Sequence, residues 1–368
     1  MPSSSHPNMT EDRVIVSQVN TYPEGFDPSM ARTLAGLIQQ AYQQFDLFEQ
    51  KNNSQSRSDL QIFNLEKPYQ LHTELAERDI PFGFVASDAS SENIYVIFRG
   101  TRRFVEWFKD ANIQLVSLKD STDRKKQKVE IKEEIVERIV QENQSSIVIP
   151  QIDNEFGFVT AGFRGIYISL RQNLIAALNQ KSPNAKVFVT GHSLGGALAT
   201  LAIPDILKNT HFTNPENIAL YTFASPRCGD RNFAMSFQEL GVQHWRIANT
   251  EDFVTMLPFP TGNVLKPAPP DAPPEADLGV GGVAGVDKNP NPIFGFFKAM
   301  YDRNKRRMPD YAHTGTPIYF TIHEAALEKH HNLDEVYMLG ISQDPLTMAA
   351  KTVSKAVEKT KNTVTDSD

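Results

Sequence analysis

The chain has 368 residues, 40% of them hydrophobic and 22% charged, so it is long enough for one large domain with insertions or for two small domains. Lys and Arg number 37 against 44 Asp and Glu, and the net charge of −7 disfavours a nucleic-acid partner. The single cysteine, Cys228, excludes an intrachain disulfide, and no Cys and His residues have the spacing of a metal site.

The N-terminal residues 1–7 are polar and lack the apolar core of a secretion signal. No apolar run reaches the roughly 18 residues that a membrane span needs. We therefore expect a protein of the cytoplasm or of a membrane periphery, with no transmembrane segment. A secreted protein written without its leader would have the same features.

Residues 1–26 are predicted to form a polar arm with a short strand at 14–16. A helix is predicted to begin next, with Asp27 as its cap and Pro28 at its first helical position. Apolar residues recur at helical spacing behind them and should be buried, namely Leu34, Leu37, Ile38, Ala41 and Phe45. Residues 46–70 are polar and favour no particular element.

Two strands are predicted at 82–87 and 94–98, joined by a hairpin turn. The second is apolar throughout, as expected of a strand that is covered on both faces. Farther along, residues 119–145 are dense in charge and predict a surface helix, for which we favour a solvated face over a binding element.

From residue 158 onward, predicted helices alternate with predicted strands. The helices end near residues 179, 208 and 240, and the strands begin at 187, 218 and 242. Such alternation predicts an α/β fold with a mostly parallel sheet and helices on both faces. We expect one domain over 27–345 with insertions near 119–152 and 259–310, followed by a C-terminal helix and polar tail over 346–368.

The stretch 186–203 joins a strand, Gly-x-Ser-x-Gly and a helix-forming run without interruption. A strand that turns sharply into a helix holds the central residue in a strained, exposed turn, and flanking glycines let the backbones pass closely. The helix N-terminus behind the turn favours developing negative charge. The pattern therefore predicts that Ser193 is a nucleophile, with the N–H of Leu194 as an oxyanion donor.

A serine hydroxyl needs a base to remove its proton, and the base needs a carboxylate to fix its tautomer. Around such an elbow the acid follows the serine and the histidine comes last. Asp252 lies just beyond the predicted strand at 242–248 and is the favoured acid, with Asp230 and Glu251 as alternatives. Five histidines are available after residue 242: His244, His313, His323, His330 and His331. His244 falls inside the predicted strand, so we expect a packed or surface role for it.

Four stretches together resemble the class 3 lipase family of α/β-hydrolases, over roughly residues 80–340. They are Ile97-Phe98-Arg99-Gly100-Thr101, Gly191-His192-Ser193-Leu194-Gly195-Gly196, the block 222–230 around Ser225-Pro226-Arg227, and the segment 246–258 that contains Asp252. The chain departs from the family at Cys228, where valine is usual, and at Val159-Thr160, where a histidine often precedes Gly162-Phe163.

The resemblance implies a triad of Ser193, Asp252 and a histidine that precedes a Leu-x-x-Tyr-like pattern. His331 fits this place best, with His330 and His313 as alternatives. The resemblance also implies that Thr101 supplies the second oxyanion donor. A lid helix over 104–108 is implied next, and packing of that helix against the core is an equal alternative.

By resemblance, the activity is that of a serine carboxylester hydrolase of the triacylglycerol lipase type, which cleaves acyl esters of glycerolipids and needs no metal or organic cofactor. A phospholipase A1 or a short-chain esterase with the same triad is the alternative enzyme. A non-catalytic lipase-like binding or signalling protein is the alternative of another class. The partner is a lipid or ester substrate. For the aromatic and basic segment 294–307 we favour helix packing with a charged edge, and a peripheral contact with a lipid surface is the alternative.

Overall fold

The computed structural model describes residues 16–18, 22–53, 63–101, 115–117, 156–258, 310–323 and 327–341. The predicted surface helix at 119–145, the lid segment 104–108, the segment 294–307 and the C-terminal tail lie outside these residues. So does nearly all of the two predicted insertions.

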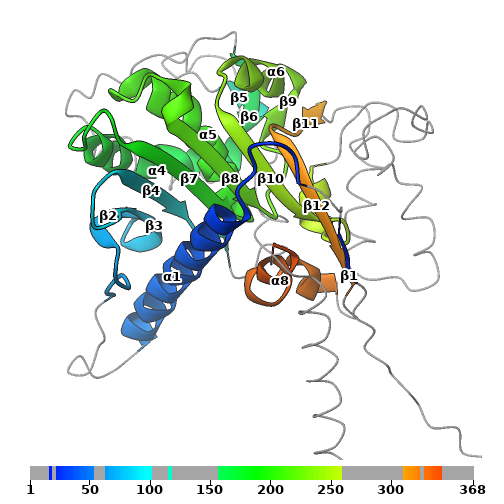
Figure 1. Cartoon of the computed structure of the whole chain (residues 1–368), viewed down its shortest axis with the longest axis horizontal. Helices are drawn as coiled ribbons and strands as arrows, with labels where there is room; N and C mark the ends of the chain where they lie inside the picture. Colours follow the sequence, from blue (N-terminus) through cyan, green and yellow to red (C-terminus); the bar gives the residue numbers. More distant parts are fainter. Residues whose placement is uncertain are drawn as a thin grey trace, which may run out of the picture.

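An eight-stranded sheet forms the centre of the molecule, in the order β1-β12-β10-β8-β7-β4-β3-β2 (Figure 1). The strands are β1 Val16–Gln18, β2 Gln70–Glu77, β3 Ile80–Ser87, β4 Asn93–Phe98, β7 Lys186–His192, β8 Ile218–Phe223, β10 Gln243–Asn249 and β12 Thr316–Ile322. The run from β12 to β4 is parallel throughout. The outer strands β1, β3 and β2 are antiparallel to their neighbours. This is the mostly parallel sheet that the sequence predicts.

Helices cover both faces of this sheet, and each face has its own apolar core. Helices α4 (Ala161–Leu178) and α5 (Leu194–Asn209) pack on one face together with α6 (Arg231–Glu239). Helix α1 (Pro28–Asn53) and the C-terminal turns Leu333–Tyr337 and α8 (Met338–Gly340) pack on the other (Figure 1). A second, small sheet has the order β11-β9-β6-β5. Its strands are β5 Leu115–Ser117, β6 Phe158–Thr160, β9 Gly229–Asp230 and β11 Tyr311–Ala312.

Helix α1 begins where the sequence predicts it. The Asp27 carboxylate accepts hydrogen bonds from the backbone N–H groups of Ser29 at 2.7 Å and Met30 at 3.1 Å, which satisfies donors that the first helical turn leaves open. The predicted apolar face is buried, apart from a half-buried Phe45. The helix continues to Asn53, into a stretch whose polar sequence gave no such indication.

The predicted hairpin is also confirmed, since β3 and β4 pair in antiparallel fashion. Strand β1 lies at 16–18 rather than 14–16, and α4 ends at Leu178 as expected. Strands β2 and β12 are absent from the predicted elements. Only every second residue of β12 is fully buried, which leaves a weaker apolar signal than a strand covered on both faces.

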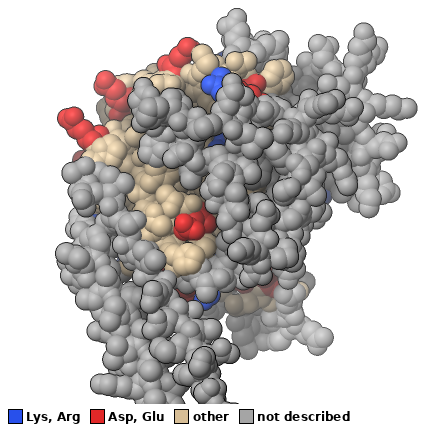
Figure 2. Space-filling view, turned by 90° about the vertical axis from the view of Figure 1, so that its right-hand side faces the viewer, with Lys and Arg blue, Asp and Glu red and all other residues tan. Residues whose placement is uncertain are grey.

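Among the described residues, no helix is long and apolar enough to cross a membrane. On the face shown in Figure 2, the Lys and Arg side chains of the described residues are few and form no continuous patch. The described part of this face therefore lacks the basic stripe that nucleic-acid binding uses.

The helix behind Ser193 is fixed to its neighbour by one buried carboxylate. Asp205 of α5 is fully buried and accepts hydrogen bonds from Tyr167 Oη at 2.6 Å and from Arg171 Nε at 2.6 Å and Nη2 at 2.8 Å. Both donors lie on α4, so this bidentate pair ties α4 to α5 where solvent does not screen it.

Replacing Arg171 by methionine leaves the Asp205 charge buried without its cation. We expect the free energy of unfolding to fall by about 3 kcal/mol, because a buried pair is costly to break on one side. Urea unfolding measures this. The matched control is Arg231→Met, which breaks the exposed pair between Arg231 and Asp310 at 2.8 Å and should cost less than about 1 kcal/mol. Equal losses in the two variants would contradict the structural role of Asp205.

Candidate active site

Four parallel strands end at one edge of the sheet, and each is followed by a residue of the predicted site. Thr101 follows β4, Ser193 follows β7, Asp252 follows β10, and His331 follows β12. In open α/β sheets the carboxyl ends of parallel strands form the edge at which active sites gather. The topology therefore brings together residues that are far apart in the chain.

Ser193 occupies a strained turn between β7 and α5, with φ 59° and ψ −127°. Non-glycine residues seldom adopt such a conformation, and it persists only where the surroundings enforce it. A Cβ on Gly191 would lie 2.1 Å from the carbonyl oxygen of Gly195, and a Cβ on Gly195 would lie 2.4 Å from that of Phe98. Side chains at these positions are excluded, so the predicted close passage of the backbones is confirmed.

One feature of the predicted turn is wrong, because Ser193 is buried rather than exposed. The backbone of Gly100 covers it, since a Cβ there would lie 2.7 Å from Ser193 Cβ. The His331 ring covers it from the other side. The sharp turn lifts the serine out of the sheet, and neighbouring loops then close over it.

A continuous chain of hydrogen bonds joins Ser193, His331 and Asp252. Ser193 Oγ lies 2.7 Å from His331 Nε2, and His331 Nδ1 lies 2.7 Å from Asp252 Oδ2. An ionised carboxylate only accepts, so Nδ1 carries the proton and Nε2 is free to accept the serine proton. This is the arrangement in which a serine hydroxyl is activated by a base.

Asp252 is almost fully buried and is held by further donors. Its Oδ1 accepts from the backbone N–H of Val254 at 2.9 Å, and its Oδ2 accepts from Tyr337 Oη at 2.7 Å. Tyr337 in turn accepts from the backbone N–H of Asn249 at 3.2 Å. Burial raises the pKa of Tyr337 well above its usual value, so its hydroxyl stays protonated and remains a donor. These bonds fix the direction in which Asp252 faces His331.

The alternative acids have other partners. Asp230 caps α6, where its Oδ1 accepts from the N–H of Phe233 at 2.8 Å, and it also accepts from the N–H of Phe158 at 3.1 Å. Glu251 is exposed, and its Oε2 lies 3.8 Å from His323 Nδ1. Neither carboxylate is bonded to the histidine beside Ser193.

The alternative histidines are likewise placed elsewhere. His313 Nε2 donates to the carbonyl oxygen of Thr255 at 2.8 Å, and His244 Nε2 lies 3.0 Å from Thr222 Oγ1. His330 is buried, and its ring centroid lies 5.6 Å from that of His323. The structure thus brings His331 alone among the five candidates within hydrogen-bonding distance of Ser193.

One expected oxyanion donor, Leu194, directly follows the serine, and the other, Thr101, follows Gly100, whose backbone lies against the serine. Leu194 is the first residue of α5, and the first N–H groups of a helix have no acceptor within it. Thr101 Oγ1 is shielded from solvent and has no hydrogen-bond partner among the described residues. A buried hydroxyl without a partner is costly, and a substrate oxygen would supply the missing acceptor.

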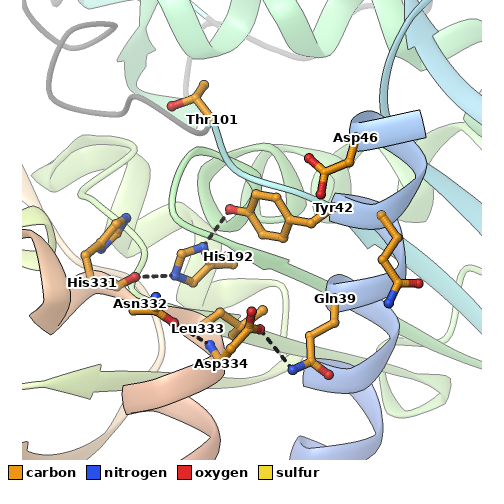
Figure 3. A pocket seen from close by; sticks show the side chains of 10 residues that line it. Gln39, Tyr42, Asp46, Thr101, His192, His331, Asn332, Leu333 and Asp334 are labelled. Atoms are coloured by element: carbon orange, nitrogen blue, oxygen red, sulfur yellow. Dashed lines mark hydrogen bonds between the residues drawn. The ribbon is translucent and has the colours of Figure 1, made fainter. Parts of the chain in front are cut away.

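A cavity of about 400 Å³ opens beside His331 (Figure 3). Helix α1 forms one wall, and the Asn332–Asp334 turn and Thr101 form the others. Most lining side chains are polar, and Asp46 and Asp334 are the carboxylates among the described lining residues. Gln39 Nε2 donates to Asp334 Oδ1 at 2.9 Å and so links two walls of the cavity.

Sequence reasoning missed several residues that contact this site. Tyr42 and Asn249 gave no signal, because a tyrosine on a helix face and an asparagine after a strand are common in any core. Tyr337 stood within the Leu-x-x-Tyr-like pattern that pointed to His331, so its place was indicated although its bond to Asp252 was not. Among the described residues, no group of three or more His, Cys, Asp and Glu side chains could hold a metal ion.

The sheet order and the serine elbow define an α/β-hydrolase fold. Residues 95–262, a little under half of the chain, match the sequence model of the family described as lipase (class 3), so this part of the chain resembles that family. The matched segment includes Thr101, Ser193 and Asp252 and ends before His331. The assignment of that histidine therefore rests on its contacts.

Two curated relatives are each similar to about half of this chain. One is a lipase of Rhizomucor miehei, 30% identical over 47% of this chain and 40% of that protein. Another is phospholipase A1-II 3 of Oryza sativa subsp. indica, 28% identical over 47% of this chain and 41% of that protein. The solved structure of lipase II from Rhizopus niveus gives a TM-score of 0.44 at 21% identity, over 67% of this chain and 78% of that one. The chain thus spans less than half the length of the curated relatives it matches.

Acid should unfold the protein through its buried histidines. Burial, with Arg246 nearby, lowers the pKa of His244 to about 3, and burial together with His331 lowers the pKa of His192 well below its usual value. Below about pH 6.5 the unfolded state therefore binds more protons than the folded one, and stability falls by about 1.4 kcal/mol per pH unit for each such histidine. The measurement is urea unfolding at a series of pH values. His244→Gln should reduce the slope of unfolding free energy against pH by one proton, and a slope equal to that of the wild type would contradict the argument.

Proposed function

We propose that this chain is a serine carboxylester hydrolase of the triacylglycerol lipase type. The observation that carries the proposal is the chain of 2.7 Å contacts from Ser193 through His331 to Asp252. The unpartnered hydroxyl of Thr101 beside it supports a place for a substrate oxygen. Residues of a triad and an oxyanion hole are thus assigned as Ser193, His331, Asp252, Thr101 and Leu194.

In the proposed reaction, Ser193 Oγ attacks the ester carbonyl carbon while its proton passes to His331 Nε2. Asp252 holds the Nδ1–H and stabilises the imidazolium that forms. The carbonyl oxygen becomes an oxyanion, which Leu194 N–H and Thr101 stabilise by about 3 kcal/mol per donor. His331 then gives its proton to the leaving alcohol. Water, deprotonated by the same histidine, attacks the acyl-enzyme and releases the carboxylic acid.

A phospholipase A1 or a short-chain esterase would use the same residues, and the relatives include both lipases and phospholipases. The cavity beside His331 favours an uncharged ester. An anionic headgroup placed there would face the carboxylates of Asp46 and Asp334, with no Lys or Arg among the described lining residues. A peripheral contact with a lipid surface stays a prediction, as does a cytoplasmic or membrane-peripheral location.

A fluorophosphonate probe tests the nucleophile. The folded wild-type protein should be labelled at Ser193, because the activated hydroxyl attacks phosphorus as it would an ester carbonyl. Ser193→Ala should not be labelled, and His331→Ala should be labelled slowly and should lose about 10⁴-fold in kcat. The matched control is the neighbouring His330→Gln, which should retain activity. An unlabelled wild-type Ser193 would leave the non-catalytic binding protein as the better assignment.

Substrate class is tested with esters that share one acyl chain. Uncharged acylglycerols should be hydrolysed with a higher kcat/KM than the corresponding phospholipid, because the two carboxylates repel phosphate. Rates are compared across a series of chain lengths, with and without a lipid interface. Asp46→Asn and Asp334→Asn should reduce the difference in kcat/KM between the uncharged acylglycerol and the phospholipid. A faster reaction on phospholipid would favour the phospholipase assignment.

A further inference from the structure

A second chain of hydrogen bonds passes behind the proposed triad, and its central member comes from α1. The backbone N–H of Gly100 lies 3.0 Å from Tyr42 Oη, and Tyr42 Oη lies 2.8 Å from His192 Nδ1. His192 Nε2 then lies 3.0 Å from the carbonyl oxygen of His331 (Figure 3). Residues of four segments that are distant in sequence are thus connected, with the Tyr42 hydroxyl in the middle.

The direction of every bond in this chain is determined. A carbonyl oxygen only accepts, so His192 must carry its proton on Nε2. Its Nδ1 is then an acceptor, and Tyr42 must donate to it. The tyrosine oxygen is left to accept the N–H of Gly100. Burial lowers the pKa of His192 well below its usual value, so the ring stays neutral and keeps this tautomer.

The contacts around the chain leave little room for displacement. A Cβ on Gly100 would lie 2.6 Å from Tyr42 Oη and 2.8 Å from the carbonyl oxygen of His192. The His192 ring is 4% exposed and lies between Tyr42 and His331, with centroid distances of 5.9 Å and 4.8 Å. The hydroxyl of Tyr42 therefore fixes the Gly100 backbone, which carries Thr101, relative to the backbone of His331.

We propose that Tyr42 is a positioning residue. Its hydroxyl holds the Gly100–Thr101 backbone directly and the His331 backbone through His192. It thereby keeps these two backbones in the relative placement that acyl transfer requires. This inference rests on the proposed function. Oxyanion donors act only within about 2.7–3.1 Å of the developing charge, and a misplacement of about 1 Å can cost about 100-fold in rate. Tyr42 thus affects the placement of both the oxyanion donor Thr101 and the base His331, without itself touching the reacting atoms.

The test is Tyr42→Phe, which removes one oxygen and keeps the ring that packs against His192. It leaves the Gly100 N–H and His192 Nδ1 without their partner. We expect kcat on a soluble ester to fall by about 10- to 100-fold while KM changes by less than about twofold, because the lost placement matters in the transition state rather than in substrate binding. Fluorophosphonate labelling of Ser193 should still go to completion, at a slower rate.

The matched control is Tyr167→Phe. It also removes a buried tyrosine hydroxyl that donates a short hydrogen bond, here 2.6 Å to Asp205, but on α4 and away from the triad. Both variants are assayed at a temperature where thermal unfolding shows them folded. Tyr167→Phe should lose stability and keep wild-type kcat, which separates positioning from a general loss of stability.

A double-mutant cycle with His192→Asn gives a second readout on the same chain of bonds. If Tyr42 acts through His192, the two single losses in kcat should combine to less than their product. The proposal would be overturned if the two losses in kcat multiplied independently. It would also be overturned if Tyr42→Phe kept the wild-type kcat or raised only KM. Failure of the proposed function is distinguishable, because the wild-type protein itself would then show neither labelling of Ser193 nor ester hydrolysis.

Discussion

The backbone of Ser193 is held in a conformation, φ 59°, that a residue with a side chain adopts only under constraint. The constraint comes from β7 and α5, because the chain passes at this one residue from a buried strand into a buried helix. Gly191 and Gly195 make the turn possible, because a Cβ at either position would lie closer to a neighbouring backbone oxygen than van der Waals contact allows. The rest of the site is arranged around the point that this turn fixes.

That arrangement depends on the parallel sheet as a whole. β4, β7, β10 and β12 point the same way, so the residues that follow them meet at one edge although they are distant in the chain. α4 is joined to α5 by the buried Asp205 and stabilises one face of the sheet. α1, on the other face, contributes Tyr42 and one wall of the polar cavity. The site therefore draws on α1 as well as on the ends of the strands.

Much of the polar interior serves placement. Asn249 illustrates this, because its side chain donates to the carbonyl oxygens of Ile322 and His330 and accepts from the N–H of Ile322, while its own N–H reaches Tyr337. The end of β12 and the start of the turn that carries His331 are thereby fixed against β10. A fully satisfied buried network of this kind specifies one geometry, since any shift would leave polar groups without partners.

The sequence by itself determined the features that depend on local pattern. The strand–glycine–serine–glycine–helix order gave the elbow, the apolar spacing gave α1, and the alternation after residue 158 gave the parallel sheet. Tertiary structure decided what depends on contacts between distant segments. His330 and His331 are adjacent in sequence and identical in type, and only the packing of their turn against β10 points His331 toward Ser193 and His330 away. Glu251 and Asp252 are likewise adjacent and both acidic, and only the fold distinguishes them, because the turn after β10 buries the carboxylate of Asp252 and leaves that of Glu251 exposed. Tyr42 had no sequence signal at all, because its partners are brought to it by the fold.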